Sequence, residues 1–399
     1  MIRGPRRVHQ LLPALLVVGL LTGCTTGTSA PAASSTSAAA TPSATVTASA
    51  TTSTSPPVTG GADAIVAAMS PSERAGQLLM TAGTVAELPG LAAGVSRYHL
   101  GGVMVRGRSA DGTAAVARAL APVRAAAPKG LPLLTATDQE GGTVQVLSGP
   151  GFSTIPSAVQ EGRGSVASTR ADAERWGEEL AKAGVRLDLA PVADVPCAAT
   201  LHDNPPIADL RRQYSSDPAT AGEHVAAFVR GMRAAGVATT VKHFPGLGCV
   251  RQNTDTVTHV VDSVTTADSA RLRAFAAGIG ADAGFVMMSS AEYSRIDPGV
   301  PALFSSRIVQ DLLRKRLGFT GVVMSDDLGG AAAVKRWSPG QRAVKFVRAG
   351  GDLMLDIVRA DLAPMEQAMV QEAAKDPRFA SALSAAATRV VAARLRLAD

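Results

Sequence analysis

The chain has 399 residues, of which 46% are hydrophobic, 4% are aromatic and 18% are charged, and its formal net charge is +6. This length and apolar content are ample for a globular fold with a large core. The sequence has no basic run and no interleaving of basic with aromatic residues, which argues against nucleic acid as a partner.

Residues 1–23 predict a bacterial export signal. Three arginines form a basic start, and an uncharged apolar run over 11–21 is too short for a bilayer span of roughly 20 residues. The signal ends in Leu-Thr-Gly-Cys, a pattern typical of a lipobox, so we expect lipidation of Cys24. An ordinary signal with a chance cysteine is the alternative. Cleavage removes three arginines and no acid, which leaves the mature chain near +3.

Residues 24–61 follow as a linker composed almost entirely of Thr, Ser, Ala, Pro and Gly, without a charge. This composition predicts a disordered tether with an end-to-end distance of about 35 Å. We therefore expect a domain over 62–399, held at the extracytoplasmic face of the cell membrane through its lipid anchor only.

Eight short runs rich in Val, Leu and Met alternate with longer helical patterns in this domain. The runs cover 77–82, 101–107, 131–138, 185–194, 237–244, 284–290, 321–327 and 351–356. Nearly continuous apolar runs are typical of strands buried on both faces. Two helical patterns, over 169–184 and 222–236, end in glycine, and Ser70-Pro71 predicts a helix start. The alternation fits a single TIM-type (β/α)8 barrel of the α/β class, with an open doubly wound sheet as the alternative.

The polar residues favour the barrel, because many of them stand at or just after the end of an apolar run. They are Asp138, Asp194, Lys242, His243, Ser289, Ser290, Asp326, Asp327 and Asp356. A barrel gathers such residues at one face, where barrel enzymes place their active sites. An open sheet would spread them along a line.

Two acidic pairs are candidates for chemistry. Asp138 and Glu140 stand in Thr-Asp-Gln-Glu-Gly-Gly, which is either a turn or a site for sugar hydroxyls or a cation. Asp326 and Asp327 follow a strand, and neighbouring strand residues point to opposite sides. We expect one to face the barrel mouth and the other to cap the next helix, with two helix caps as the alternative.

Lys242 and His243 close another predicted strand. The histidine is either a hydrogen-bonded core residue or a site residue, and the lysine also permits Schiff-base chemistry if it is desolvated. The sequence has no metal-ligand spacing, no P-loop and no nucleophile elbow of a serine triad, so we expect no metal and no cofactor.

Several motifs together resemble family 3 glycoside hydrolases of the β-N-acetylglucosaminidase (NagZ-like) type. They are KHFPGLG at 242–248, DQEGG at 138–142, APVAD at 190–194 and SDDL at 325–328, extended by the segments 204–218 and 348–356. The resemblance covers nearly all of 62–399. Together with the lipobox and the linker, it is similar to the actinobacterial lipoprotein branch of the family.

The resemblance implies a monomeric barrel that removes terminal β-linked N-acetylglucosamine from cell-wall peptidoglycan fragments with retention of configuration. It assigns Asp326 as the nucleophile. Four residues match the family's sugar ligands: Asp138, Arg212, Lys242 and His243. Arg211 is an alternative to Arg212, because two extra residues stand nearby. The low aromatic content fits a short exo-acting pocket better than a long sugar-stacking cleft.

The sequence departs from the family at the acid/base position. The family's Asp-Ser-His is replaced by residues 253–255, Asn-Thr-Asp, so the usual Asp–His dyad cannot form there. We expect Asp255 to act as the acid/base opposite Asp326, at the roughly 5–5.5 Å separation of a retaining pair. His259 is a second candidate, on a loop that we expect to be mobile.

Several alternatives remain open. The missing dyad permits a catalytically weakened barrel that binds wall sugars, and a phosphorylase would use phosphate in place of water; a Lys242 aldolase is a further reading. Thr143 and Val146 replace two family arginines, which predicts altered subsite recognition. Cys197 and Cys249 are left as a pair in an oxidising setting, and the sequence leaves open whether they are bonded.

Overall fold

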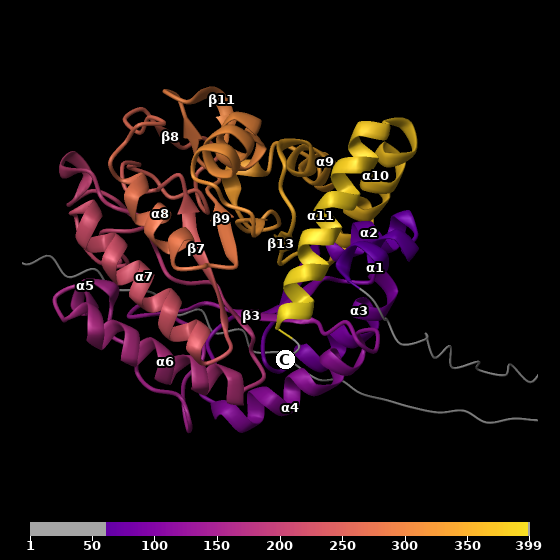
Figure 1. Cartoon of the computed structure of the whole chain (residues 1–399), viewed down its shortest axis with the longest axis horizontal. Helices are drawn as coiled ribbons and strands as arrows, with labels where there is room; N and C mark the ends of the chain where they lie inside the picture. Colours follow the sequence, from indigo (N-terminus) through magenta and orange to yellow (C-terminus); the bar gives the residue numbers. More distant parts are fainter. Residues whose placement is uncertain (1–60, 398–399) are drawn as a thin grey trace, which may run out of the picture. The chain divides into compact units, whose positions relative to one another are not determined.

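A computed structural model describes residues 61–397 (Figure 1). The predicted signal, Cys24 and nearly all of the linker lie outside the described residues. Each predicted apolar run contains one strand of an eight-stranded sheet. These strands are β1 (Leu79–Gly83), β2 (Gly102–Val105), β3 (Leu134–Thr137), β6 (Leu187–Asp188), β7 (Ala238–Phe244), β9 (Phe285–Met288), β12 (Val322–Ser325) and β13 (Met354–Asp356).

The eight strands form a parallel barrel in chain order. Neighbouring strands pair from β1 through β12, and the last strand, β13, pairs in parallel with β1, with Leu79 opposite Met354. A parallel bridge between Met324 and Leu353 joins β12 to the chain just before β13. The ring is therefore nearly closed, which confirms the TIM-type barrel and excludes the open sheet.

Helices follow the strands and cover the outside of the barrel (Figure 1). They are η1 (Leu88–Leu91) with α3 (Ala92–Tyr98), α4 (Gly112–Ala125), α5 (Ala158–Glu161) with α6 (Val166–Lys182), α7 (Pro218–Ala234), α8 (Leu272–Gly280), the π-helix η4 (Arg307–Arg316), α9 (Pro339–Ala349), α10 (Leu362–Lys375) and α11 (Pro377–Arg396). Gly184 and Gly236, which follow α6 and α7, have φ of +80° and +72°, a conformation that glycine adopts at little cost.

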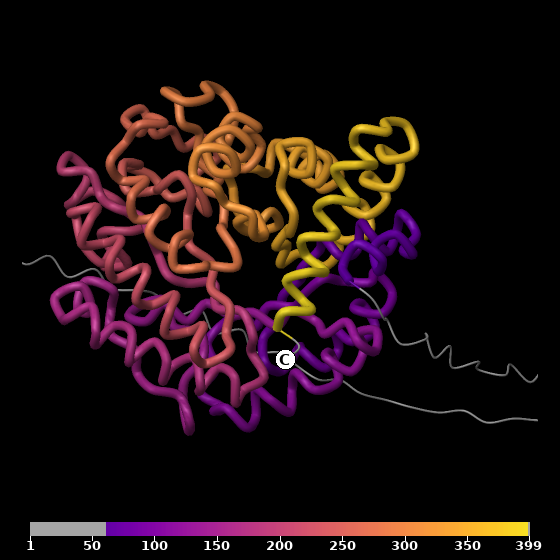
Figure 2. Tube along the Cα trace, viewed as in Figure 1, coloured from indigo at the N-terminus to yellow at the C-terminus, as the bar shows by residue number. Residues whose placement is uncertain are grey.

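Two helices precede the first strand, α1 (Ala62–Ala68) and α2 (Pro71–Gln77). Ser70 and Glu73 form the capping box that starts α2, as the sequence predicts. The first of these helices lies beside α11, and α2 lies beside both α10 and α11 (Figure 2). The guanidinium of Arg74 donates to the hydroxyl of Ser384 in α11 at 3.2 Å, so opposite ends of the domain are joined.

Two apolar layers explain why the strand runs are continuous. Side chains such as Met80, Leu134 and Phe285 fill the barrel interior. Neighbours on the same strands, such as Val103 and Val286, pack outward against the helices. Every residue of the barrel strands except Ala238 is thus buried, whichever way it points. Among residues 61–397, no helix is long and apolar enough to cross a membrane.

Short additional strands follow three of the barrel strands in the chain: β3, β7 and β9. The hairpin β4 (Gln139–Gly141) and β5 (Val144–Gln145) follows β3. A second small sheet contains β8 (Val261–Asp262), β10 (Glu292–Tyr293) and β11 (Asp297–Pro301). The shorter helical turns are η2 (Ala198–Thr200), η3 (Ala302–Phe304), η5 (Ala332–Val334) and η6 (Arg359–Asp361). Of these segments, the hairpin of β4 and β5 contributes Glu140 and Val144 to the candidate site.

Candidate active site

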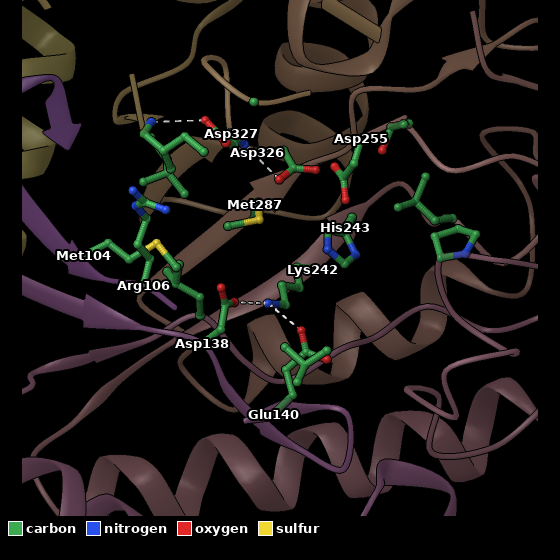
Figure 3. A pocket seen from close by; sticks show the side chains of 18 of the residues that line it. Met104, Arg106, Asp138, Glu140, Lys242, His243, Asp255, Met287, Asp326 and Asp327 are labelled. Atoms are coloured by element: carbon green, nitrogen blue, oxygen red, sulfur yellow. Dashed lines mark hydrogen bonds and ion pairs between the residues drawn. The ribbon is translucent and has the colours of Figure 1, made fainter. Parts of the chain in front are cut away.

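A cavity of about 490 Å³ lies at the carboxyl ends of the barrel strands (Figure 3). Polar and charged residues from six different strand ends or loops line it: Arg106, Asp138, Glu140, Arg212, Lys242, His243, Asn253, Asp255, Asp326 and Asp327. The predicted convergence of strand-end residues therefore occurs. Met104, Met287, Leu355 and Ile357 supply apolar surface.

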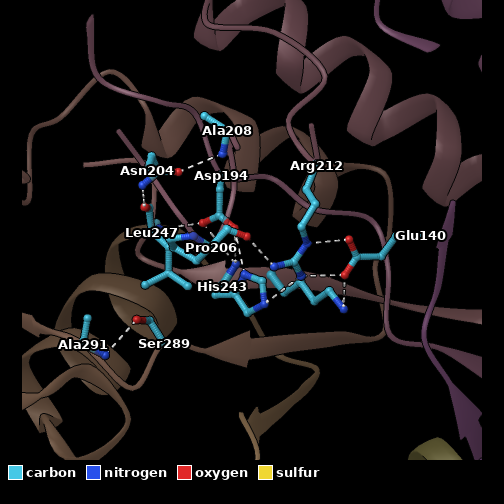
Figure 4. A network of polar contacts seen from close by, with 12 residues as sticks. Glu140, Asp194, Asn204, Pro206, Ala208, Arg212, His243, Leu247, Ser289 and Ala291 are labelled. Atoms are coloured by element: carbon cyan, nitrogen blue, oxygen red, sulfur yellow. Dashed lines mark hydrogen bonds and ion pairs between the residues drawn. The ribbon is translucent and has the colours of Figure 1, made fainter. Parts of the chain in front are cut away.

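Four of these side chains alternate in charge along one wall. Lys242 Nζ lies 2.6 Å from Asp138 Oδ1 and 2.7 Å from Glu140 Oε1. Arg212 donates from Nε and Nη2 to the two oxygens of Glu140, at 2.8 Å and 2.6 Å (Figure 4). The wall is thus electrically balanced, and each buried cation is held by a carboxylate.

These ion pairs determine the protonation states of Glu140 and Lys242. Burial by itself would raise the pKa of Glu140, but the charges of Arg212 and Lys242 outweigh it and the pKa falls to about 2. Burial would lower the pKa of Lys242, but Asp138 and Glu140 outweigh it and raise that pKa. Lys242 therefore stays a cation, which disfavours the Schiff-base alternative, because that chemistry needs a neutral amine.

A β-bulge explains how both Lys242 and His243 line the cavity. The pairing of β7 with β9 shifts register between Lys242 and Phe244, which interrupts the usual alternation of side chains. Asp194 then orients the imidazole, with Oδ2 at 2.7 Å from His243 Nδ1 (Figure 4). Since a carboxylate accepts, Nδ1 carries a proton, and Nε2 lies 3.5 Å from Arg212 Nη2.

Asp326 follows β12 directly and lies in the cavity. Its Oδ1 accepts the N–H of Asp327 at 2.8 Å. Burial raises the pKa of Asp326 to about 6; the nearby His243 lowers this pKa, and the carboxylate of Asp255 raises it further. The carboxyl groups of Asp326 and Asp255 point toward one another across the cavity (Figure 3). Asp326 is ionised at neutral pH in this environment.

The loop after β7 brings Asp255, and not His259, to the cavity. The backbone oxygen of Asp255 accepts the N–H of Ala332 at 3.2 Å. Ala332 follows Asp326 by six positions in the chain. The side chain of His259 is 62% exposed and lies 3.2 Å from Glu292, and it does not line the cavity. Of the two acid/base candidates, only Asp255 thus has the placement that the role requires.

Known proteins match this chain over most of the barrel. Residues 72–393 match the model of the glycosyl hydrolase family 3 N-terminal domain. The chain belongs to glycosyl hydrolase family 3. A β-hexosaminidase of Xanthomonas oryzae pv. oryzae is 36% identical over 263 residues, which are 64% of this chain and 75% of the relative.

Solved structures of family 3 proteins agree with this assignment. The β-N-acetylhexosaminidase from Beutenbergia cavernae has 48% identity and a TM-score of 0.79, over 82% of this chain and 98% of the other. LpqI of M. tuberculosis has 27% identity and a TM-score of 0.72, over 84% and 96%. The family membership makes this protein a glycoside hydrolase, and several of its relatives are β-hexosaminidases.

The structure tests the expectation for the two adjacent aspartates, Asp326 and Asp327. The prediction that one of the two adjacent aspartates caps a helix is wrong. Asp327 also lines the cavity, and its Oδ1 accepts the N–H groups of Gly329 and Ile357 at 2.9 Å and 3.2 Å. The strand ends at Ser325, so strand alternation does not apply to the two residues after it.

Arg212, and not Arg211, lines the cavity. Arg211 is exposed, has φ of +58° and does not line the cavity. Cys197 and Cys249 form a disulfide, with their Cα atoms 5.1 Å apart. Within residues 61–397, no group of three or more His, Cys, Asp or Glu side chains is arranged to hold a metal ion.

Sequence reasoning missed two features of the site. Arg106 lines the cavity, and it follows β2 directly, the same strand-end position that singled out Asp138. Asp194 was noted only as a strand-end acid, and nothing in the sequence connects it to His243, 49 positions away. The strand-end rule would have found Arg106; the partner of His243 required the structure.

Proposed function

We propose that this protein is an exo-acting, retaining β-N-acetylhexosaminidase that removes terminal N-acetylglucosamine from cell-wall peptidoglycan fragments. One observation carries the proposal: Asp326 and Asp255 face each other across a cavity walled by Asp138, Lys242 and His243 (Figure 3). The β-hexosaminidase relatives support the choice of sugar. A volume of about 490 Å³ is that of a small-ligand pocket and suits a terminal sugar.

In the first step, the ionised carboxylate of Asp326 attacks the anomeric carbon. A carbon–oxygen bond forms to Asp326 while the glycosidic carbon–oxygen bond breaks, and the leaving oxygen takes a proton from Asp255, which must enter this step as the carboxylic acid. In the second step, Asp255 takes a proton from water as the water attacks the same carbon. The ester bond to Asp326 breaks, and the sugar leaves with its original configuration.

The charged wall would bind the hydroxyl groups of the sugar. Lys242 presents N–H donors, Asp138 presents carboxylate oxygens, and Arg212 presents a guanidinium fixed by Glu140. His243 presents Nε2, because its Nδ1 is bonded to Asp194. A site built from paired buried charges discriminates strongly against sugars that leave those groups unpaired.

The sequence supports a location outside the cell. Lipidation of Cys24 would anchor the protein at the extracytoplasmic face of the membrane, with residues 24–61 as the tether. The anchor is the only membrane contact that we propose. A Cys24→Ala variant should move from the membrane fraction to the soluble fraction; a variant that stays membrane-bound would refute the anchor.

The catalytic proposal is tested with aryl β-glycosides and proton NMR of the products. We expect hydrolysis of the β-N-acetylglucosaminide with initial release of the β-anomer, and no dependence on phosphate. Asp326→Asn should abolish turnover, whereas Asp268→Asn, which alters an exposed ion pair with Arg316, should keep it.

Three outcomes would contradict the proposal. Turnover retained by Asp326→Asn would remove the nucleophile assignment. Phosphate-dependent formation of a sugar phosphate would indicate a phosphorylase. Saturable binding of wall fragments without turnover of any glycoside would indicate a sugar-binding barrel.

A further inference from the structure

The first residues of the loop that carries Asp255 are attached to the segment after β6. Cys249 is joined to Cys197 by the disulfide. Beside it, the N–H of Cys197 donates to the carbonyl oxygen of Gly248 at 3.0 Å, and the hydroxyl of Thr200 donates to the same oxygen at 2.6 Å. The disulfide is the covalent member of this set of contacts.

A buried asparagine extends the attachment. Asn204 donates from Nδ2 to the carbonyl oxygens of Leu247 and Val250, at 2.9 Å and 2.7 Å. An ion pair between Arg251 and Asp203 continues the contact at the surface. The path of residues 247–251 is thus set by the segment 197–204.

The later part of the loop is attached to the segment that follows the proposed nucleophile. The N–H groups of Ala332 and Ala333 donate to the backbone oxygens of Asp255 and Thr254, at 3.2 Å and 3.1 Å. The side chain of Asn253 accepts the N–H of Asp255 at 2.9 Å. Asp255 is therefore held at the second attachment, six positions after the half-cystine of the first.

We propose that the Cys197–Cys249 disulfide is a positioning element for Asp255, and that its reduction selectively slows proton transfer to the leaving group. The inference rests on the proposed role of Asp255 as general acid. Without the disulfide, the loop keeps its buried hydrogen bonds, the buried side chains of Leu247 and Val250, and an exposed ion pair, but it has no covalent attachment. Asp255 then reaches the glycosidic oxygen less often, and small misplacements of a catalytic group have large effects on rate.

The disulfide is accessible to a small reductant. Both cysteines are 7% exposed, and they line a cavity of about 550 Å³ together with Thr200, Val260 and Val264. Reduction breaks the sulfur–sulfur bond and forms two thiols. A dithiol such as dithiothreitol supplies the two electrons and two protons and is itself oxidised to a cyclic disulfide.

The test compares kcat/KM for two aryl β-N-acetylglucosaminides on the folded, oxidised protein and on the same protein in dithiothreitol. kcat/KM reports the steps up to the glycosyl-enzyme. A phenolate leaving group needs a proton, whereas 2,4-dinitrophenolate leaves without one. We expect reduction to lower kcat/KM about tenfold for the phenyl substrate and less than about twofold for the dinitrophenyl substrate.

Two variants complete the experiment. A Cys197→Ser/Cys249→Ser double variant should match the reduced protein and should not respond to dithiothreitol. Asp203→Asn removes only the exposed ion pair of the same attachment and should change both substrates less than about twofold. Circular dichroism and the thermal midpoint show whether each sample is folded; if the double variant does not fold, the folded, reduced wild-type protein decides.

Two results would overturn the inference. An equal loss for both substrates would mean that the disulfide only stabilises the fold, and no loss for the phenyl substrate in the reduced protein would mean that the hydrogen bonds suffice. If the oxidised protein hydrolyses neither substrate, the proposed function itself fails, and this inference fails with it.

Discussion

Replacing Glu140 by glutamine should destabilise the fold by about 3 kcal/mol at pH 7. Glu140 is 7% exposed and contacts both Lys242 and Arg212, so the substitution leaves two buried cations with one fewer carboxylate. The pKa of Glu140 is about 2 against an ordinary 4.5, and at about 1.4 kcal/mol per pKa unit the difference corresponds to ~3 kcal/mol. Breaking a buried ion pair typically costs about 3–5 kcal/mol, which agrees.

The sign of the pH dependence follows from the lowered pKa. The contribution of Glu140 is fully present above the unfolded pKa of about 4.5, and it is lost as the pH falls from there through about 2. The gap between wild-type protein and Glu140→Gln should therefore shrink to about 2 kcal/mol at pH 3.5. Urea unfolding at pH 7 and pH 3.5 measures both values.

An exposed glutamate offers the matched control. Glu178 lies 3.9 Å from Lys182 on the surface of α6, and Glu178→Gln should change stability by less than about 1 kcal/mol at both pH values. A Glu140→Gln effect below about 1 kcal/mol at pH 7, or one that grows toward acid, would refute the reasoning.

Two further predictions concern the nucleophile and the helix layer. Because the pKa of Asp326 is about 6 and the nucleophile must be ionised, the acid limb of kcat/KM should have its midpoint at about pH 6; an acid limb below pH 5 would contradict this. Gly231→Ala should destabilise by about 1–3 kcal/mol, because its Cβ would lie 2.8 Å from the Cβ of Ala173 and collide with the backbone oxygen of Arg170. Gly280→Ala, which meets no atom within 4 Å, is the control for urea unfolding, and equal midpoints for the two variants would exclude the packing explanation.

The sequence by itself determined the barrel and much of its active face. Apolar runs predict buried strands, and glycine or a capping box predicts a helix end, because each of these signals depends only on residues close together in the chain. The positions of Asp138, Lys242 and Asp326 at strand ends then follow from the order of the elements, since parallel strands in a barrel end at one face.

Only the tertiary structure decided which loop residues reach that face. Asp255 lines the cavity and His259 does not, because the loop is attached at Cys249 on one side and at Ala332 on the other. The strand ends at Ser325, so the two aspartates after it do not alternate in direction, and Asp327 lines the cavity instead of capping a helix. Each outcome depends on contacts between residues far apart in the chain, and the geometry of such contacts is set by folding and not by local pattern.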